Sequence, residues 1–410
     1  MKLFDELKWR GLINDMTSPD LEEKLNAGGL TFYIGTDPTG DSLHIGHYST
    51  LLCAKRLKEH GHHPIMLVGG ATGFIGDPKA SGERSMLTPE VLNHNYECLS
   101  KQIEALFGFE MVNNLDWTKD ITIIDFLRDY GKFFNVNYMI NKETVKRRLD
   151  TGISYTEFSY MLLQALDFLH LYETKNCTLQ LGGQDQWGNI TSGLELIRKK
   201  HGADVACYGL TMPLITKADG TKFGKSETGT VWLDKNKTSA YEMYQFLVNS
   251  EDAKVIDYLK KLTFLSKEEI DELEEKVKTE PFKREAQKAL AKEVVCFLHG
   301  EQEYEKACKI TNALFKGNIK DLAQDEMKDA LKGFEKREVQ DQLTLVDVLV
   351  EANIASSKRE AREWIQQGSI QVNGEKIQDL EYIVSKEAAI CEQDTLIKKG
   401  KRNYFVIHQQ

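Results

Sequence analysis

The chain has 410 residues, of which 41% are hydrophobic and 28% charged, and its formal net charge is −10. This composition excludes a disordered or fibrous protein, and the length predicts two or three domains rather than one core. The acidic balance argues against nucleic-acid binding by the whole surface, although a single domain can still carry a basic patch.

Neither membrane insertion nor secretion is expected from the sequence. No apolar stretch approaches the roughly 20 residues of a membrane helix, and the first residues lack the apolar run of a secretory signal. The seven cysteines are scattered without a Cys-x-x-Cys pair. This usage predicts a reducing compartment with neither a disulfide framework nor structural zinc, so we expect a cytoplasmic protein.

The first part of the chain has the pattern of an α/β fold. Residues 30–36 and 64–68 are typical of short buried strands, and another is predicted over 179–182. The helix after the first strand is expected to be capped by Asp41 or Ser42 and to end at Gly61. Strand, helix and strand in succession predict a βαβ unit and therefore a parallel sheet. Helical patterns fill much of 90–175.

Strand patterns disappear after about residue 235, where amphipathic helices with capping-box residues begin. The charged stretch 335–341 is interpreted as a linker. A small α+β unit follows, with helices expected near 344–352 and 357–367 and strands near 370–372 and 404–407. The predicted domains are therefore 1–235, 236–335 and 343–410.

The strongest local motif is Thr39 followed by His44-Ile45-Gly46-His47. The two histidines are predicted in the first turn of a helix that follows a parallel strand. Free N–H groups and the positive end of the helix dipole favour phosphate at such a position. The imidazoles and the Thr39 hydroxyl can add donors, and Gly46 lets a flat base approach. A pair of surface or capping histidines, or a chance metal site, is the alternative.

Lys222-Phe223-Gly224-Lys225-Ser226 forms a second motif. Two lysines in a glycine-flanked loop can act as a mobile cationic clamp on charge that develops on pyrophosphate. An ordinary solvated lysine loop is the alternative, and it is the commoner case.

Tyr160, Gln164 and Asp167 fall on one face of a predicted helix, at i, i+4 and i+7. Their neighbours are apolar, so these polar groups are costly to bury without partners. A substrate ammonium for Tyr160 and Gln164, and a phenol hydroxyl for Asp167, would supply them. A hydrogen-bonded core cluster without a ligand is the alternative.

These motifs together resemble the bacterial-type tyrosyl-tRNA synthetases, a class I aminoacyl-tRNA synthetase family, along nearly the whole chain. Residues 44–47 match the HIGH signature, and residues 222–226 match the signature usually written KMSKS. Residues 152–168 and 182–190 are similar to stretches typical of this family. The resemblance implies a Rossmann-like catalytic domain, a helical anticodon-side domain and a small RNA-binding domain of S4 type.

The resemblance implies a tyrosine–tRNA ligase. L-Tyrosine would attack ATP to form tyrosyl-adenylate and pyrophosphate, and the tyrosyl group would then pass to the terminal ribose of tRNA(Tyr). Mg²⁺ would accompany ATP without a dedicated protein metal site or a tightly bound cofactor. A homodimer is likewise implied by the family.

The site residues follow from the same resemblance. The catalytic set would be Thr39, His44, His47, Lys222, Lys225 and Ser226. Tyrosine would be bound by Tyr33 and Asp167 at the phenol, by Asp77, Tyr160 and Gln164 at the ammonium, and by Gln180 and Gln186 at the border. ATP would be bound by Gly35, Asp37, Gly46, Gly183, Asp185 and Lys225.

The C-terminal unit carries basic residues that resemble those of S4-type domains. Lys358, Arg359 and Arg362 begin a predicted helix near a turn at Asn373-Gly374, and residues 398–402 form a second basic cluster. They could follow an RNA backbone, and Arg84 matches a basic position tied to ATP or tRNA. A solvated basic helix face is the alternative.

Three other functions remain open from the sequence alone. Ala71-x-Gly73-x-x-Gly76 is a relaxed dinucleotide fingerprint that would predict nicotinamide binding. A non-catalytic RNA-binding relative could keep the same fold. Tryptophan is the nearest rival substrate, because its synthetase shares the architecture, but Tyr33 with Asp167 favours a phenol.

Overall fold

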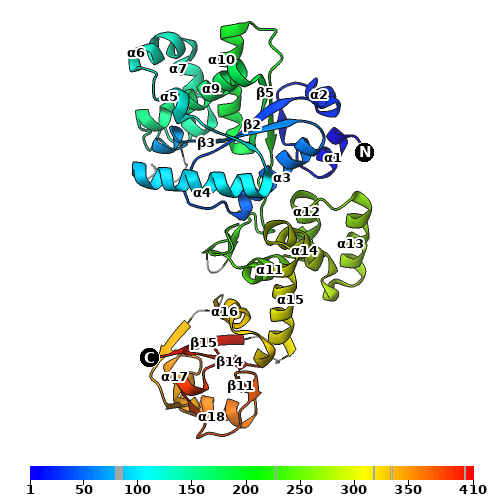
Figure 1. Cartoon of the computed structure of the whole chain (residues 1–410), viewed down its shortest axis with the longest axis vertical. Coiled ribbons are helices and arrows are strands. Elements are labelled where there is room, and N and C mark those ends of the chain that lie inside the picture. Colours follow the sequence, from blue (N-terminus) through cyan, green and yellow to red (C-terminus); the bar gives the residue numbers. More distant parts are fainter. Residues whose placement is uncertain (79–85, 227–228, 317–318, 333, 335, 401–402) are drawn as a thin grey trace. The chain divides into compact units, whose positions relative to one another are not determined.

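The computed structural model describes residues 1–78, 86–226, 229–316, 319–332, 334, 336–400 and 403–410. It contains two compact units (Figure 1). Unit 1 consists of Met1–Lys237 and Ser250–Leu290, and unit 2 of Thr238–Asn249 and Ala291–Gln410. The three-domain division predicted from the sequence stays a prediction.

Unit 1 is built on a six-stranded sheet in the order β1-β6-β5-β2-β3-β4. The strands from β2 to β6 run parallel, and the short β1 pairs antiparallel with β6. The predicted parallel α/β sheet is therefore confirmed. The strands are β1 (Asp15–Met16), β2 (Thr31–Thr36), β3 (His63–Val68), β4 (Glu110–Asn113), β5 (Cys177–Gly183) and β6 (Tyr208–Met212).

The long helices of unit 1 pack against this sheet. α3 (Ile45–Glu59) connects β2 to β3, and α4 (Pro89–Phe107) connects β3 to β4. α9 (Tyr155–Lys175) and α10 (Trp187–His201) pack together, and their apolar residues form a core with Tyr33, Ile65 and Leu67 of the strands. Crossovers between parallel strands are right-handed. A helix whose connection runs one way along the sheet therefore covers one face, and a helix whose connection runs the other way covers the opposite face.

Unit 1 also contains shorter helices and strands. They are α1 (Leu3–Trp9), α2 (Leu21–Ala27), η1 (Thr72–Phe74), α5 (Leu115–Thr118), α6 (Ile123–Asp125), η2 (Phe126–Tyr130), η3 (Gly131–Phe133), α7 (Val136–Ile140), α8 (Glu143–Lys146), η4 (Gln184–Gln186), β7 (Lys225–Ser226), β8 (Gly229–Thr230), α12 (Asp252–Leu262), α13 (Lys267–Thr279) and η5 (Pro281–Lys283). The division between the units falls within α14 (Glu285–His299).

The start of α3 differs from the prediction. His44 is the N-cap, and α3 begins at Ile45 rather than next to Asp41 or Ser42. Residues 43–45 are extended because they pair with the distant segment 231–233: the Leu233 N–H donates to the Leu43 carbonyl at 2.8 Å and the Ile45 N–H to the Val231 carbonyl at 2.9 Å. The histidines are therefore the N-cap and the third helical residue, not both inside the first turn.

Unit 2 combines helices with a five-stranded sheet in the order β12-β11-β14-β15-β9. The predicted strand at Ile370–Val372 and the helix after Ser357 are confirmed. The elements are α11 (Ala240–Val248), α15 (Glu301–Lys316), η6 (Ile319–Asp321), α16 (Gln324–Lys332), β9 (Lys336–Val339), β10 (Leu343–Thr344), α17 (Leu345–Glu351), α18 (Lys358–Gln366), β11 (Ile370–Val372), β12 (Glu375–Lys376), β13 (Ile383–Val384), η7 (Lys386–Ala388), β14 (Asp394–Lys399) and β15 (Asn403–Gln409).

The predicted linker at 335–341 is wrong. Residues 336–339 form strand β9, which pairs parallel with β15 at the edge of the sheet. Of these four residues only Val339 is buried, and charged side chains are common on edge strands because they discourage pairing with other chains. An edge strand with this composition therefore has the sequence pattern of a linker.

No helix within the described part of the chain is both long enough and apolar enough to span a bilayer.

Candidate active site

A cavity of about 370 Å³ opens at the carboxyl ends of β2 and β5. The chain leaves β2 for β3 on one side, whereas β5 leads to β6 on the other. Such a switch point is where open α/β sheets bind ligands. The cavity is lined by most of the predicted site residues: Tyr33, Gly35, Asp37, Thr39, His44, Gly46, His47, Asp77, Tyr160, Gln164, Asp167, Gln180, Gly183, Asp185, Gln186 and Lys222.

The remaining predicted residues lie elsewhere or are not described. Lys225 and Ser226 form β7, but their side chains lie outside the described structure, as does all of Arg84. Lys358, Arg359 and Arg362 are exposed on unit 2.

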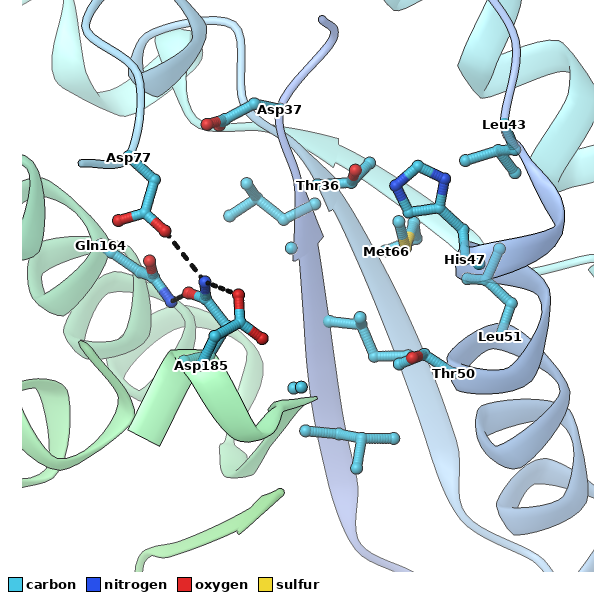
Figure 2. A pocket seen from close by; sticks show the side chains of 18 of the residues that line it. Thr36, Asp37, Leu43, His47, Thr50, Leu51, Met66, Asp77, Gln164 and Asp185 are labelled. Atoms are coloured by element: carbon cyan, nitrogen blue, oxygen red, sulfur yellow. Dashed lines mark hydrogen bonds between the residues drawn. The ribbon is translucent and has the colours of Figure 1, made fainter. Parts of the chain in front are cut away.

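Two walls of different chemistry face each other across β2. Figure 2 shows Asp77, Gln164 and Asp185 on one side of this strand, and His47 with Thr50 on α3 at the other. Asp37 lies directly after the strand. The carboxylates and amides are thus separated from the imidazoles by the width of the central strand.

The histidine wall is ordered by the end of α3. The Nδ1 atom of His44 accepts from the Gly46 N–H at 3.1 Å, and that of His47 accepts from the His44 N–H at 3.3 Å. The rings stack with their centroids 3.8 Å apart. Because Nδ1 is the acceptor in both rings, the neutral imidazole carries its proton on Nε2 and can donate it.

Both imidazoles are neutral near pH 7. Burial, together with the neighbouring His44, lowers the pKa of His47 to about 3. Burial and then the positive charge of Lys222 lower the pKa of His44. A side chain at Gly46 would bring its Cβ within 2.9 Å of the His44 ring, so glycine is required there. The wall therefore offers neutral hydrogen-bond donors, and among the described side chains Lys222 supplies positive charge beside them.

The opposite wall is an amide and carboxylate network centred on Gln186. Its Nε2 donates to Asp77 Oδ2 at 3.0 Å, and its Oε1 accepts from Gln164 at 3.2 Å (Figure 2). Asn189 donates to the other Asp77 oxygen at 3.3 Å. Burial raises the pKa of Asp77 to about 6 against the lowering effect of the two amides. A cationic ligand group here would restore the ionised carboxylate.

Tyr160 is linked to Asp37, at the end of β2. Its hydroxyl donates to Asp37 Oδ2 at 3.0 Å, and the Thr72 hydroxyl donates to Asp37 Oδ1 at 2.7 Å. Asp37, which the resemblance assigns to ATP, therefore contacts a residue assigned to tyrosine. The predicted convergence of Tyr160, Gln164 and Asp167 on one pocket is present in the geometry.

The end of the cavity around Asp167 is buried and polar. Asp167 Oδ1 accepts from Trp117 Nε1 at 2.9 Å, and Oδ2 accepts from Asn114 Nδ2 at 3.0 Å. Burial raises the pKa of Asp167 to about 7, although both donors lower it. Two further buried atoms that line the cavity, the Tyr33 hydroxyl and Gln180 Oε1, have no hydrogen-bond partner among the described residues. Native proteins rarely leave such groups unsatisfied.

Sequence reasoning missed Asn114, Trp117, Thr72 and Asn189. Asn114 follows β4, whose carboxyl end shares the edge of the sheet with β2 and β5, so a prediction of β4 would have found it. The sequence pattern of this region indicates helix instead. Trp117 gave no signal, because a tryptophan on a short helix is usually a packing residue.

Unit 2 holds the predicted basic residues on α18, whose N-cap is Ser357. Lys358 is already paired with Asp347 at 2.6 Å. Lys399 lies 3.1 Å from the centroid of the Trp364 ring, whereas Lys401 and Arg402 lie outside the described residues.

The glycine run at 71–76 lacks the structure of a dinucleotide fingerprint. Residues 72–74 form a single 3₁₀ turn, and α4 begins only at Pro89. A fingerprint loop must open a helix whose N-terminus holds the pyrophosphate. In the described residues, this run does not provide one.

Comparison with known proteins agrees with this geometry. Residues 25–316 match the family model of tRNA synthetases class I (W and Y), and residues 326–407 match that of the tyrosine–tRNA ligase SYY-like C-terminal domain. The tyrosine–tRNA ligases of Bacillus pumilus and Staphylococcus carnosus are each 51% identical, with 99% of both chains covered.

A solved structure is similar as well. The C-terminally truncated mitochondrial tyrosyl-tRNA synthetase of Coccidioides posadasii aligns with a TM-score of 0.67 at 31% identity, over 75% of this chain and 91% of that one. The predicted resemblance is confirmed by full-length relatives, which are tyrosine rather than tryptophan ligases. The chain therefore belongs to the tyrosyl-tRNA synthetase family of class I tRNA synthetases.

Proposed function

We propose that the chain activates L-tyrosine with ATP and transfers it to the 3′-terminal ribose of tRNA(Tyr). The observation that carries the proposal is the buried Asp167 end of the cavity. A phenol hydroxyl placed there would donate to Asp167 and accept from the Tyr33 hydroxyl, which otherwise has no partner among the described residues. Phenylalanine would leave the buried Tyr33 hydroxyl without a partner, at a cost of about 1–3 kcal/mol, and it would lose the additional hydrogen bond that the phenol donates to Asp167.

The rest of the amino acid fits the wall around Gln186. The ammonium would lie near Asp77, Tyr160 and Gln164, and it would favour the ionised form of Asp77. Gln180 and Gln186 would border the substrate, and the buried Oε1 of Gln180 is available to accept from it.

Activation needs no protein nucleophile, because the substrate carboxylate is one. A carboxylate oxygen bonds to the α-phosphorus, the bond from that phosphorus to the bridging oxygen breaks, and pyrophosphate leaves with the electron pair. The protein orients the reactants and stabilises charge on the departing phosphates. We assign this role to Thr39, His44, His47 and Lys222, joined by Lys225 and Ser226.

ATP would occupy the crevice at the ends of β2 and β5. Gly35, Gly46 and Gly183 would let its base and ribose approach the backbone, with Asp37 and Asp185 as acceptors for ribose hydroxyls. Mg²⁺ would enter with ATP as part of the substrate, on phosphate oxygens and water.

In the second step a terminal ribose hydroxyl of the tRNA attacks the tyrosyl carbonyl, and AMP leaves. We assign the RNA backbone to exposed Arg359 and Arg362 on α18, with Lys358 and Arg84 as further contacts. Phosphate contacts of this kind predict affinity that falls as salt rises.

A homodimer is supported by the exposed apolar side chains. Of the thirteen large ones in the described chain, seven fall between residues 123 and 155. Ile123 and Tyr155 are 72% and 71% exposed. Such a concentration is typical of an interaction surface. We expect a dimer in analytical ultracentrifugation, and we expect Ile124→Asp to weaken it; a monomeric parent protein would refute this part.

The cytoplasm is the proposed compartment. All seven cysteines are free thiols, which suits a reducing environment.

The test is amino-acid-dependent exchange of labelled pyrophosphate into ATP. We expect exchange with tyrosine, and none above background with phenylalanine or tryptophan. Exchange driven by tryptophan would refute the phenol assignment, and no exchange with any of the three would favour a non-catalytic RNA-binding protein. Charging of tRNA(Tyr) with labelled tyrosine then tests the second step.

A further inference from the structure

Lys222 lies in a hairpin formed by residues 215–223. This hairpin packs against α12, a helix outside the signature motifs. Residues 215–217 pair with 221–223: the Lys217 N–H donates to the Thr221 carbonyl at 2.8 Å, and the Phe223 N–H to the Ile215 carbonyl at 3.0 Å. Thr216 and Lys222 form the bridge between the two legs. The position of the Lys222 side chain in the cavity therefore depends on how this hairpin is oriented.

Tyr258 of α12 contacts both legs of the hairpin. Its hydroxyl donates to the Thr216 carbonyl at 3.0 Å, and its ring centroid lies 4.4 Å from that of Phe223. The side chain is 2% exposed, so water does not compete for these contacts. One turn earlier, Lys254 reaches the Thr216 hydroxyl at 3.5 Å. Tyr258 thus contacts Thr216, which pairs with Lys222, and Phe223, which follows Lys222 in the chain.

The other end of α12 is fastened to the helix that carries the histidines. Arg56 of α3 donates to the Thr263 carbonyl, just after α12, at 2.8 Å. Arg10 donates to the Lys260 and Leu265 carbonyls at 3.0 and 2.7 Å. Glu6 accepts from both guanidinium groups, at 2.8 Å from Arg10 and 2.7 Å from Arg56. α12 is therefore a rigid connection from α3 to the hairpin.

We infer that Tyr258 is a positioning residue that aligns Lys222 with the His44–His47 pair. The inference rests on the proposed function, because it gives Lys222 its role in pyrophosphate departure. Catalysis by fixed charges requires that the cation already be placed when charge develops. Tyr258 does not itself line the cavity and reaches it only through the hairpin, where its ring packs on Phe223. Its effect should therefore be seen in the rate of activation and not in tyrosine binding.

The test is Tyr258→Phe, which keeps the ring stacked on Phe223 and removes the hydrogen bond. We expect kcat for tyrosine-dependent pyrophosphate exchange to fall by about tenfold, the size of one buried hydrogen bond, with KM for tyrosine unchanged and the melting temperature lowered by only about 2–4 °C. Tyr208→Phe is the matched control, because Tyr208 is also buried but stands at the amino end of β6, away from the cavity. An unchanged kcat in Tyr258→Phe overturns the inference.

A double-mutant cycle with Lys222→Ala tests whether Tyr258 affects catalysis through Lys222. If Tyr258 acts through Lys222, Tyr258→Phe has almost no further effect on kcat once Lys222 is alanine. An equal loss of kcat in both backgrounds would overturn the assignment, because the two residues would then act independently.

Amide hydrogen exchange provides a readout that needs no activity. We expect faster exchange at Lys217 and Phe223 in Tyr258→Phe than in the parent or in Tyr208→Phe. Unchanged amide exchange at these two residues would refute the claim that Tyr258 fixes the hairpin. Failure of the proposed function is a different result, namely a parent protein that shows no tyrosine-dependent pyrophosphate exchange.

Discussion

Replacement of Asp167 by asparagine should have opposite effects on catalysis and on stability. The substitution keeps the shape of the side chain but removes a buried charge. Tyrosine would lose a charge-assisted hydrogen bond from its phenol, so we expect KM for tyrosine to rise by about 10- to 100-fold. The ligand-free protein, by contrast, should become more stable at alkaline pH.

The size of the stability effect follows from the pKa of Asp167. Burial raises that pKa from 3.8 to about 7, a shift of about three units, each worth about 1.4 kcal/mol. Between about pH 4 and pH 7 the folded state binds more protons than the unfolded state, so the free energy of unfolding falls as the pH rises. The ionised carboxylate therefore costs up to about 4 kcal/mol above pH 7, and much less near pH 4.

Asparagine removes this cost but has one of its own. Its amide cannot accept from both Trp117 and Asn114, so one of the two hydrogen bonds is lost, at about 1–2 kcal/mol. We therefore expect Asp167→Asn to be more stable than the parent by about 2–3 kcal/mol at pH 8, and slightly less stable near pH 4.

Urea unfolding followed by tryptophan fluorescence measures this difference, because four of the five tryptophans lie in unit 1. The parent and the variant would be compared at several pH values, so that groups common to both cancel. A difference in unfolding free energy that stays constant from about pH 4 to pH 8 would refute the raised pKa of Asp167 and the reasoning built on its burial.

Three further predictions concern the cavity. Lys222→Ala should lower kcat for pyrophosphate exchange by about 100-fold and leave tyrosine affinity in equilibrium dialysis unchanged; a matching loss of tyrosine binding would contradict its role at the phosphates. KM for tyrosine should rise as the pH falls through about 6, because protonated Asp77 no longer attracts the ammonium, and this dependence should disappear in Asp77→Asn. Gly224→Ser should destabilise unit 1 by about 1–3 kcal/mol and slow exchange, because φ is +109° and a Cβ would lie 2.8 Å from Ile45 Cγ2; an unchanged urea midpoint would contradict this strain.

Three of the strands that the sequence predicts correctly are central strands of the parallel sheet. β2, β3 and β5 are nearly continuous apolar runs, as central parallel strands are, and the polar and glycine residues that follow them in the sequence line the cavity. β4 and β9 were missed because each is an edge strand with few buried residues. Asn114 was missed along with β4, so an error at the sheet edge became an error in the site.

The N-cap of α3 could not be predicted from local preferences. Asp41 and Ser42 are better caps than histidine in isolation. Ser42 instead donates to the Leu43 carbonyl, and Gln102 accepts from the Leu43 N–H at 2.8 Å. Together with the pairing to 231–233, these contacts keep the chain extended through His44. The helix start is thus decided by residues far away in the sequence.

The two walls of the cavity differ in charge, and together they can orient a bound amino acid in a way that neither wall could alone. Asp77 and Asp185 lie across β2 from His47, which stacks on His44, and the charge of Lys222 acts on His44. An amino acid with its ammonium toward the aspartates and its side chain on Asp167 must direct its carboxylate away from them, toward the side where a polyanion is tolerated. Protonated histidines would hold triphosphate tightly from the beginning, whereas neutral donors together with lysine can strengthen their contacts as charge moves onto the leaving group. If His44 and His47 act on the phosphates as we propose, the burial that lowers their pKa values contributes to catalysis.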